Sequence, residues 1–72
     1  MNKEYYFITY IWKNSQMREY STENAVINTN PLQTILDWEN LERETDKKAD
    51  YKLLFYAEIT KEEFDKYEGE FN

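Results

Sequence analysis

Eight consecutive residues near the amino terminus, Tyr5 to Trp12, constrain the fold of this chain more than any other segment. All eight are aromatic or β-branched, which are the residue types that favour a β-strand. Successive side chains of a strand point to opposite faces, so Phe7 and Ile11 lie on one face. The opposite face carries Tyr6, Ile8, Tyr10 and Trp12. Both faces of this strand are therefore expected to be buried against other parts of the chain or against a partner.

A length of 72 residues predicts a single small domain that spans residues 1–72. A chain of this size buries only about 60% of the surface of its unfolded state. It can cover one face of a small sheet with its own helices, which leaves the second face as a predicted contact surface. There is no Cys and no His, so the usual zinc and copper sites and all disulfides are excluded, and we expect no cofactor.

The net charge of −6 is unevenly distributed along the chain. Residues 1–36 carry three acids and three bases, whereas residues 37–72 carry the other twelve acids and six bases. An acidic surface repels phosphate backbones and attracts basic partners, so we expect a basic protein partner and no direct binding of long nucleic acid. The alternative is that the acids only keep a small aromatic protein in solution.

The aromatic run is too short, and its tyrosines too polar, for a signal peptide or a membrane span. We therefore expect a cytoplasmic protein that makes no contact with a membrane.

Turn-forming residues divide the first half of the chain into a hairpin and a helix. The polar residues 13–16 interrupt the first strand, and a weaker strand pattern, typical of a sheet edge, resumes from Met17 to about Ile27. Asn30 can cap a helix that begins at Pro31, where the missing N–H of proline costs nothing. This helix is expected to end near Thr45, with Leu32, Ile35, Leu36 and Leu41 as its apolar stripe.

A third strand and a second helix are predicted in the remaining half. Residues 51–59 alternate, with an inward set expected at Tyr51, Leu53, Phe55, Ala57 and Ile59. Thr60 and Glu63 match a capping box, in which each side chain satisfies a backbone donor at a helix start. Gly69 is the expected end of this second helix.

The order of elements is therefore β-β-α-β-α, which predicts an α+β fold. We expect a three-stranded, mostly antiparallel sheet with both helices packed on one face. The strand order 2-1-3 is favoured because it places the aromatic strand in the centre, and 1-2-3 is the alternative.

Residue types that carry catalysis are scarce in this sequence. A catalytic triad needs a base, and the chain has no His. Paired carboxylates can act as acid and base, but a fold of 72 residues has little room for a cleft between them. Asp46 and Asp50 lack the spacing and the glycine of a calcium-binding EF-hand loop. We therefore expect that the protein is not an enzyme.

Surface recognition remains as the expected role. On the predicted sheet, aromatic side chains form a platform on the face turned away from the helices, and such rings are enriched at protein interfaces. Acidic side chains would steer the approach of a basic partner. The predicted platform consists of Tyr6, Tyr10, Trp12, Tyr20 and Tyr56, and the predicted steering acids are Asp37, Glu42, Glu62 and Asp65.

Three alternatives to a foreign protein partner stay open. The platform could mediate self-association, or a segment of the same chain could cover it. It could also bind a nucleotide or cyclic dinucleotide, with a Tyr or Trp ring stacked on a base and Lys13, Arg18 or Lys52 near a phosphate.

Three segments of the chain carry a family resemblance: Tyr5 to Tyr10, the Asn30-Pro31 helix start, and Glu58 to Phe64. Together they resemble the short acidic proteins of phages and bacterial mobile elements. This resemblance implies a compact, non-catalytic inhibitor that blocks a host defence enzyme, and it assigns no functional residue.

Overall fold

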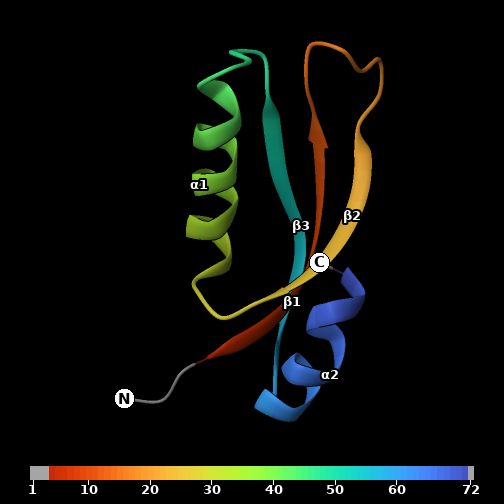
Figure 1. Ribbon diagram of the computed structural model, residues 1–72, viewed down its shortest axis with the longest axis vertical. Helices are drawn as coiled ribbons and strands as arrows, with labels where there is room; N and C mark the ends of the chain where they lie inside the picture. The colour runs from red at the N-terminus through yellow and green to blue at the C-terminus, as the bar shows by residue number, and fades with distance from the viewer. Residues whose placement is uncertain (1–3, 72) are drawn as a thin grey trace.

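The computed structural model describes residues 4–71, with side chains described for residues 4–69 (Figure 1). The predicted order of elements and the α+β class are confirmed. The elements are β1 (Tyr5–Lys13), β2 (Ser21–Ile27), α1 (Pro31–Arg43), β3 (Asp50–Ile59) and α2 (Lys61–Phe71).

The three strands form one antiparallel sheet in the order β2-β1-β3, as favoured from the sequence. β1 lies in the centre, where Phe7 pairs with Val26 of β2 on one side and with Ala57 of β3 on the other. The aromatic strand β1 therefore has a hydrogen-bonded neighbouring strand on each of its two edges. β2 starts four residues later than expected, because the segment from Met17 to Tyr20 forms irregular structure after the turn.

A bulge in β3 changes which of its side chains face the core. Thr9 pairs with Phe55 but Tyr10 pairs with Leu53, so Leu54 is an extra residue in the ladder. An extra residue reverses the face of every side chain beyond it. Tyr51 and Leu53 therefore share one face, and Phe55, Ala57 and Ile59 share the other. The prediction that these five residues share one face was wrong, because a plain alternation does not reveal a bulge.

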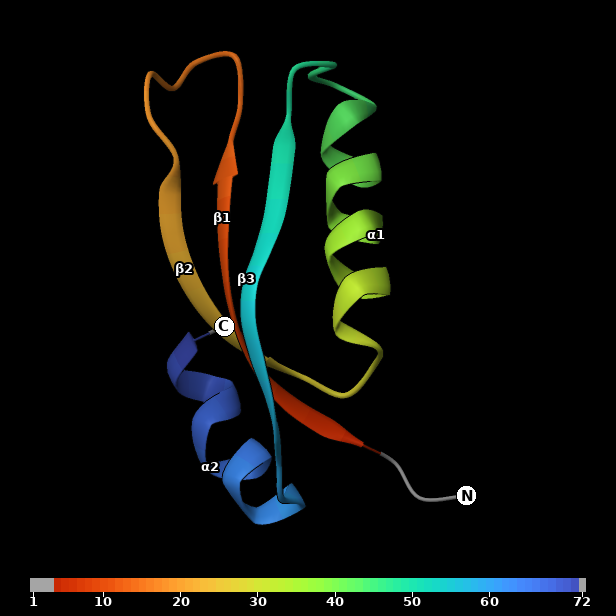
Figure 2. The ribbon, with the colours of Figure 1, turned by 180° about the vertical axis from the view of Figure 1, so that it is seen from behind.

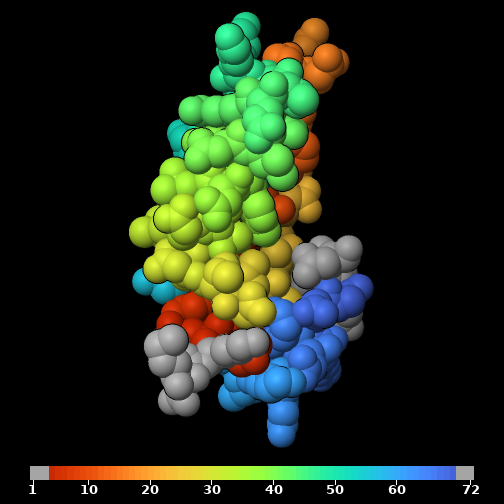
Figure 3. All heavy atoms as spheres, turned by 60° about the vertical axis from the view of Figure 1, so that its left-hand side comes forward, coloured from red at the N-terminus to blue at the C-terminus, as the bar shows by residue number. Residues whose placement is uncertain are grey.

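α1 covers the face of β1 that carries the even-numbered side chains. Ile8 is fully buried and clusters with Ala25 and Ile27 of β2 and with Ile35 of α1. The ring of Tyr10 packs against Trp38 of α1, with centroids 5.2 Å apart. Figure 3 shows α1 as the ridge that forms most of one side of the molecule. The prediction that this face is turned away from the helices was wrong, because it holds the main core.

α2 packs on the opposite face of the sheet. Its buried Phe64 lies against Tyr5, with ring centroids 4.8 Å apart, and Tyr5 has the odd parity of β1. Val26, which shares that face through its pairing with Phe7, is also buried. The two ribbon views place α1 beside β3 and α2 at the opposite side of the strongly twisted sheet (Figures 1 and 2). The prediction that both helices share one face was therefore wrong.

Both predicted helix starts are confirmed in atomic detail. Asn30 Oδ1 accepts the backbone N–H of Gln33 at 3.0 Å, with Pro31 as the first helical residue. In the capping box, Glu63 N donates to Thr60 Oγ1 at 3.1 Å and Thr60 N donates to Glu63 Oε1 at 3.0 Å. The predicted helix ends are less accurate, because α1 ends at Arg43 and Gly69 lies inside α2 rather than after it.

Candidate functional site

Tyr10 and Trp12, the centre of the predicted platform, belong to a ladder of four rings. The ring centroids are 5.2 Å apart for Trp38 and Tyr10, 6.1 Å for Tyr10 and Tyr51, and 5.8 Å for Tyr51 and Trp12. All four residues are partly buried. Burial raises the pKa of the Tyr10 hydroxyl, with a smaller contribution from the charge of Glu23. These rings pack against one another between the sheet and α1, so they do not form an open binding face.

Tyr6 and Tyr56 lie on the same face of the sheet, further toward α2 along the strands. Their rings meet edge to face, with centroids 5.9 Å apart. The Tyr6 hydroxyl donates to the carboxylate of Glu4, and this bond raises the pKa of Tyr6 to about 12. Tyr6 is partly buried, whereas Tyr56 is 54% exposed. Of the platform residues on the strands, Tyr56 is therefore the most accessible.

The four predicted steering acids do not form one surface. Asp37 and Glu42 lie on α1, where Asp37 accepts a hydrogen bond from Gln33 Nε2 at 2.9 Å. Glu62 and Asp65 lie on α2, across the sheet, where Asp65 pairs with Lys61 at 2.8 Å. The four acids thus lie as two separate pairs, one on each helix.

A different group of apolar side chains is strongly exposed around the outer edge of β3. Leu32 and Leu36 of α1 are 63% and 50% exposed, and Leu54 and Phe55 of β3 are 57% and 54% exposed. Together with Tyr56 they form the surface that we call the edge surface. It wraps around β3, since Tyr56 lies on the α1 face of the sheet and Phe55 on the opposite face.

Two hydrogen bonds fix the side of α1 that lies along β3. Glu39 Oε1 accepts the backbone N–H of Tyr51 at 3.0 Å, and Arg43 Nε donates to the carbonyl of Ala49 at 2.8 Å. Leu32 and Leu36 follow the same helical stripe as Glu39 and Arg43, because residues spaced by three, four and seven share a side of a helix. The two leucines therefore lie beside β3, one and two turns nearer to the start of α1.

The edge surface was not predicted from the sequence, because Leu32, Leu36 and Leu41 were expected in the apolar stripe of the helix, facing the core. The structure instead buries Pro31, Thr34 and Ile35. The sequence feature that could have indicated this surface is the run from Leu53 to Tyr56. This run is apolar without alternation, so its side chains cannot all point to one buried face of the sheet.

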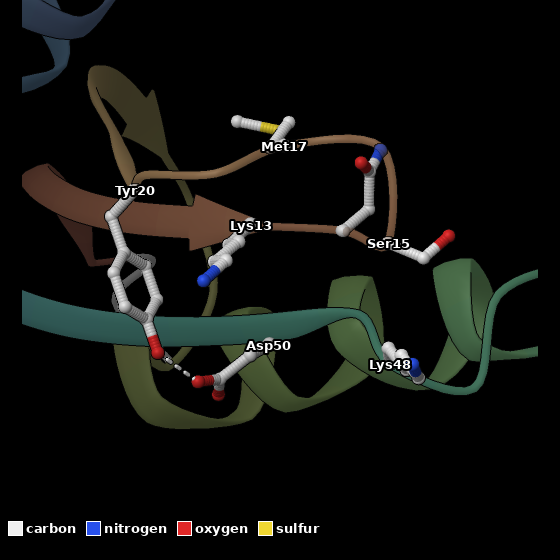
Figure 4. A pocket seen from close by; sticks show the side chains of 7 residues that line it. Lys13, Ser15, Met17, Tyr20, Lys48 and Asp50 are labelled. Atoms are coloured by element: carbon white, nitrogen blue, oxygen red, sulfur yellow. Dashed lines mark hydrogen bonds between the residues drawn. The ribbon is translucent and has the colours of Figure 1, made fainter.

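Tyr20 lies away from the other platform residues, in a pocket of about 360 Å³ at the turn of the hairpin. Its hydroxyl donates to the carboxylate of Asp50 (Figure 4). The ammonium groups of Lys13 and Lys52 lie 5.7 Å and 5.3 Å from the centroid of its ring. Of the three cations expected near a phosphate, Lys13 and Lys52 are thus close to the ring of Tyr20. Only Lys13 of the three lines the pocket. The lining residues are Lys13, Asn14, Ser15, Met17, Tyr20, Lys48 and Asp50.

The carboxylate of Asp46 connects the hairpin turn to the loop between α1 and β3. It accepts hydrogen bonds from Ser15 N at 2.9 Å and Ser15 Oγ at 2.7 Å, and its second oxygen accepts the backbone N–H of Lys48 at 3.0 Å. The bonds from Ser15 lower the pKa of Asp46, with a further contribution from Lys48. We call this arrangement the Asp46 clasp.

Within residues 4–69, no three acidic side chains converge in a group that could hold a metal ion. Neither helix, over its described length, is long and apolar enough to cross a membrane. Comparisons with protein-family models, with curated proteins and with solved structures find no match to this chain.

Proposed function

We propose that this chain is a non-catalytic protein-binding module, an inhibitor or adaptor, that contacts its partner through the edge surface. The observation that carries the proposal is the exposure of Leu32, Leu36, Leu54, Phe55 and Tyr56, each at 50% or more, around one edge of a very small sheet. Contiguous apolar patches on soluble proteins mark association sites, and aromatic side chains in them supply much of the binding energy.

The edge surface is suited to contacts through side chains rather than to the addition of a strand. A bulge at Leu54 interrupts the ladder, and Glu39 already accepts the outward N–H of Tyr51. Bulges, charged side chains and covering helices are features that protect sheet edges from pairing with other strands. A partner with an apolar groove therefore fits this surface better than a partner with a free strand.

The charge next to the edge surface favours a basic rim on that partner. Glu58 follows Tyr56 by two residues, and α2 then adds Glu62 and Asp65 from the predicted set. These acids are exposed and lie at the α2 end of the molecule. Attraction between exposed charges speeds association and weakens as salt screens it. The role as an inhibitor of a bacterial defence enzyme is proposed from the family resemblance. A cytoplasmic location is proposed from the sequence, because the aromatic run is too short and too polar for a membrane span and the chain has no Cys.

Paired serine substitutions test the edge surface. Leu36→Ser with Leu54→Ser should weaken partner binding by at least about tenfold, because apolar anchors at an interface centre carry most of the affinity. Stability should change little, since exposed substitutions usually stay within about 0.5 kcal/mol. Binding is measured by quantitative capture of proteins from bacterial lysate, followed by titration of the captured protein.

Leu41→Ser is the matched control, because Leu41 is 66% exposed but lies nine residues after Leu32, on the opposite side of α1. It should leave binding unchanged. Equal binding by the paired variant and the control would refute the edge surface as the contact. Sedimentation of the purified chain decides between a foreign protein and a second copy, since self-association through this surface would disappear in the paired variant alone.

A further inference from the structure

We propose that the pocket at the hairpin turn is a second site, separate from the edge surface, that binds the phosphate group of a mononucleotide-sized ligand. Figure 4 shows Lys13 and Tyr20 on one side of the pocket, Asp50 beside them, and Lys48 across from them. Its volume of about 360 Å³ falls within the range of about 300–1,000 Å³ that is usual for small-molecule sites.

Cations are concentrated at this end of an otherwise acidic molecule. The two segments that meet there, residues 13–20 and 43–52, carry six of the nine Lys and Arg residues but only four of the fifteen acids. The rest of the chain therefore has a larger excess of negative charge than the total of −6. An anionic ligand is repelled by the α2 end and attracted to the hairpin end.

Two ammonium groups in the pocket are available to an anion. Lys13 ends β1 and Lys48 lies in the loop before β3, so the two cations come from separate segments and lie on opposite sides of the pocket (Figure 4). Among the described side chains, neither lies within 4.0 Å of a carboxylate oxygen. The acid in the pocket, Asp50, is already engaged by the Tyr20 hydroxyl and by Lys52 at 3.9 Å.

Apolar groups complete the pocket beside these cations. Met17 and the ring of Tyr20 line it, and the bond to Asp50 fixes the direction of the ring. Lys13 lies 5.7 Å from the ring centroid, so a base stacked on Tyr20 would place its phosphate within reach of that ammonium. An aromatic ring beside one cation, with a second cation across the pocket, matches a nucleotide better than it matches a simple oxyanion.

The Asp46 clasp holds the two walls of the pocket together before any ligand binds. It joins Ser15 of the turn to Asp46 in the loop that carries Lys48. A site whose walls are already fixed loses less conformational entropy on binding. The small volume of the pocket also favours a single nucleotide over a polymer.

Titrations followed by two-dimensional ¹H–¹⁵N NMR test this site on the full chain. The probes are adenosine and guanosine monophosphate, a cyclic dinucleotide, inorganic phosphate and adenosine. We expect saturable shifts at Lys13, Ser15 and Lys48 with at least one of the nucleotides, and weaker effects with phosphate or adenosine alone. Absence of saturable shifts with every nucleotide at millimolar concentration would overturn the proposal.

Neighbouring lysines provide the matched variants. Lys48→Gln should weaken nucleotide binding by about tenfold, in line with the loss of one charge-assisted hydrogen bond. Lys47→Gln removes the same charge one residue away, outside the pocket lining, and should change affinity by less than about twofold. Equal weakening by both variants would show general attraction to the cationic end and would contradict a built site. Partner binding through the edge surface should be unchanged in both lysine variants. Either proposal, the edge surface or the pocket, can therefore be refuted without refuting the other.

Discussion

The two faces of the sheet differ in how completely a helix covers them. On the α1 face, Ile8 is 0% exposed, and the side chains around it form a cluster joined by Tyr10, Trp38 and Tyr51. On the α2 face, Phe64 packs against Tyr5 near one end of the strands, while Phe55 on the same face is 54% exposed. Cover by the chain's own helices is thus deep on one face and partial on the other.

This contrast separates the residues that stabilise the fold from those available for contact. Apolar burial is the main stabilising contribution in a small domain, and most of it lies beneath α1. Of the seven large apolar side chains that are exposed in the described part of the chain, five lie around β3, where the cover ends. Aromatic content alone therefore does not identify a binding surface, because the same strand supplies side chains to the core and to the partly open face.

Ile8→Ala should have the largest effect on stability, because it removes the most deeply buried side chain of the α1 face. Large-to-small substitutions at enclosed sites cost about 2–5 kcal/mol, which is comparable to the whole stability of a small domain. Urea denaturation followed by circular dichroism should show a largely unfolded or strongly destabilised protein. A loss below about 1 kcal/mol would show that the core does not lie beneath α1.

Phe64→Ala should cost less, about 1–3 kcal/mol, because Phe64 packs against one end of the sheet and most of the other described side chains of α2 are exposed. The loss of stability should also be confined mainly to α2. Hydrogen exchange should accelerate at the amides of α2, while those of β1 and α1 keep their protection relative to one another. Uniform loss of protection across all elements would contradict the distinction between the two faces.

Asp46→Asn tests the clasp through its dependence on pH. The pKa of Asp46 is lowered in the folded protein, so its contribution to stability is complete above the unfolded value of about 3.9. The contribution is lost as the pH falls through the lower, folded value. The variant should therefore be less stable than the native chain at pH 7, and this difference should shrink on acidification below about pH 4. Urea midpoints at a series of pH values measure it, and a difference that stays constant to the lowest pH would contradict the clasp.

Local signals predicted the elements well because their causes are local. Asn30 with Pro31, and Thr60 with Glu63, fix helix starts through contacts within four residues of the chain. The central position of β1 also followed from its own composition. These features do not depend on how the helices pack.

The candidate site could not be predicted in the same way because its causes are distant along the chain. The face covered by α1 depends on the handedness of the connection from β2 to β3, and one bulge at Leu54 reverses the faces of β3. The pocket depends on the approach of Lys48 to the hairpin turn, which Ser15 and Asp46 fix across 31 residues of sequence. No periodicity in the sequence reports such contacts.

Solvent accessibility measured by NMR tests most directly the claim that the edge surface, rather than the aromatic face of β1, is open to a partner. A soluble paramagnetic chelate broadens the signals of methyl groups that it can approach. In the free protein, the methyl signals of Leu36 and Leu54 should broaden strongly, whereas those of Ile8 should remain sharp. Strong broadening at Ile8 with protection of Leu36 and Leu54 would contradict the account.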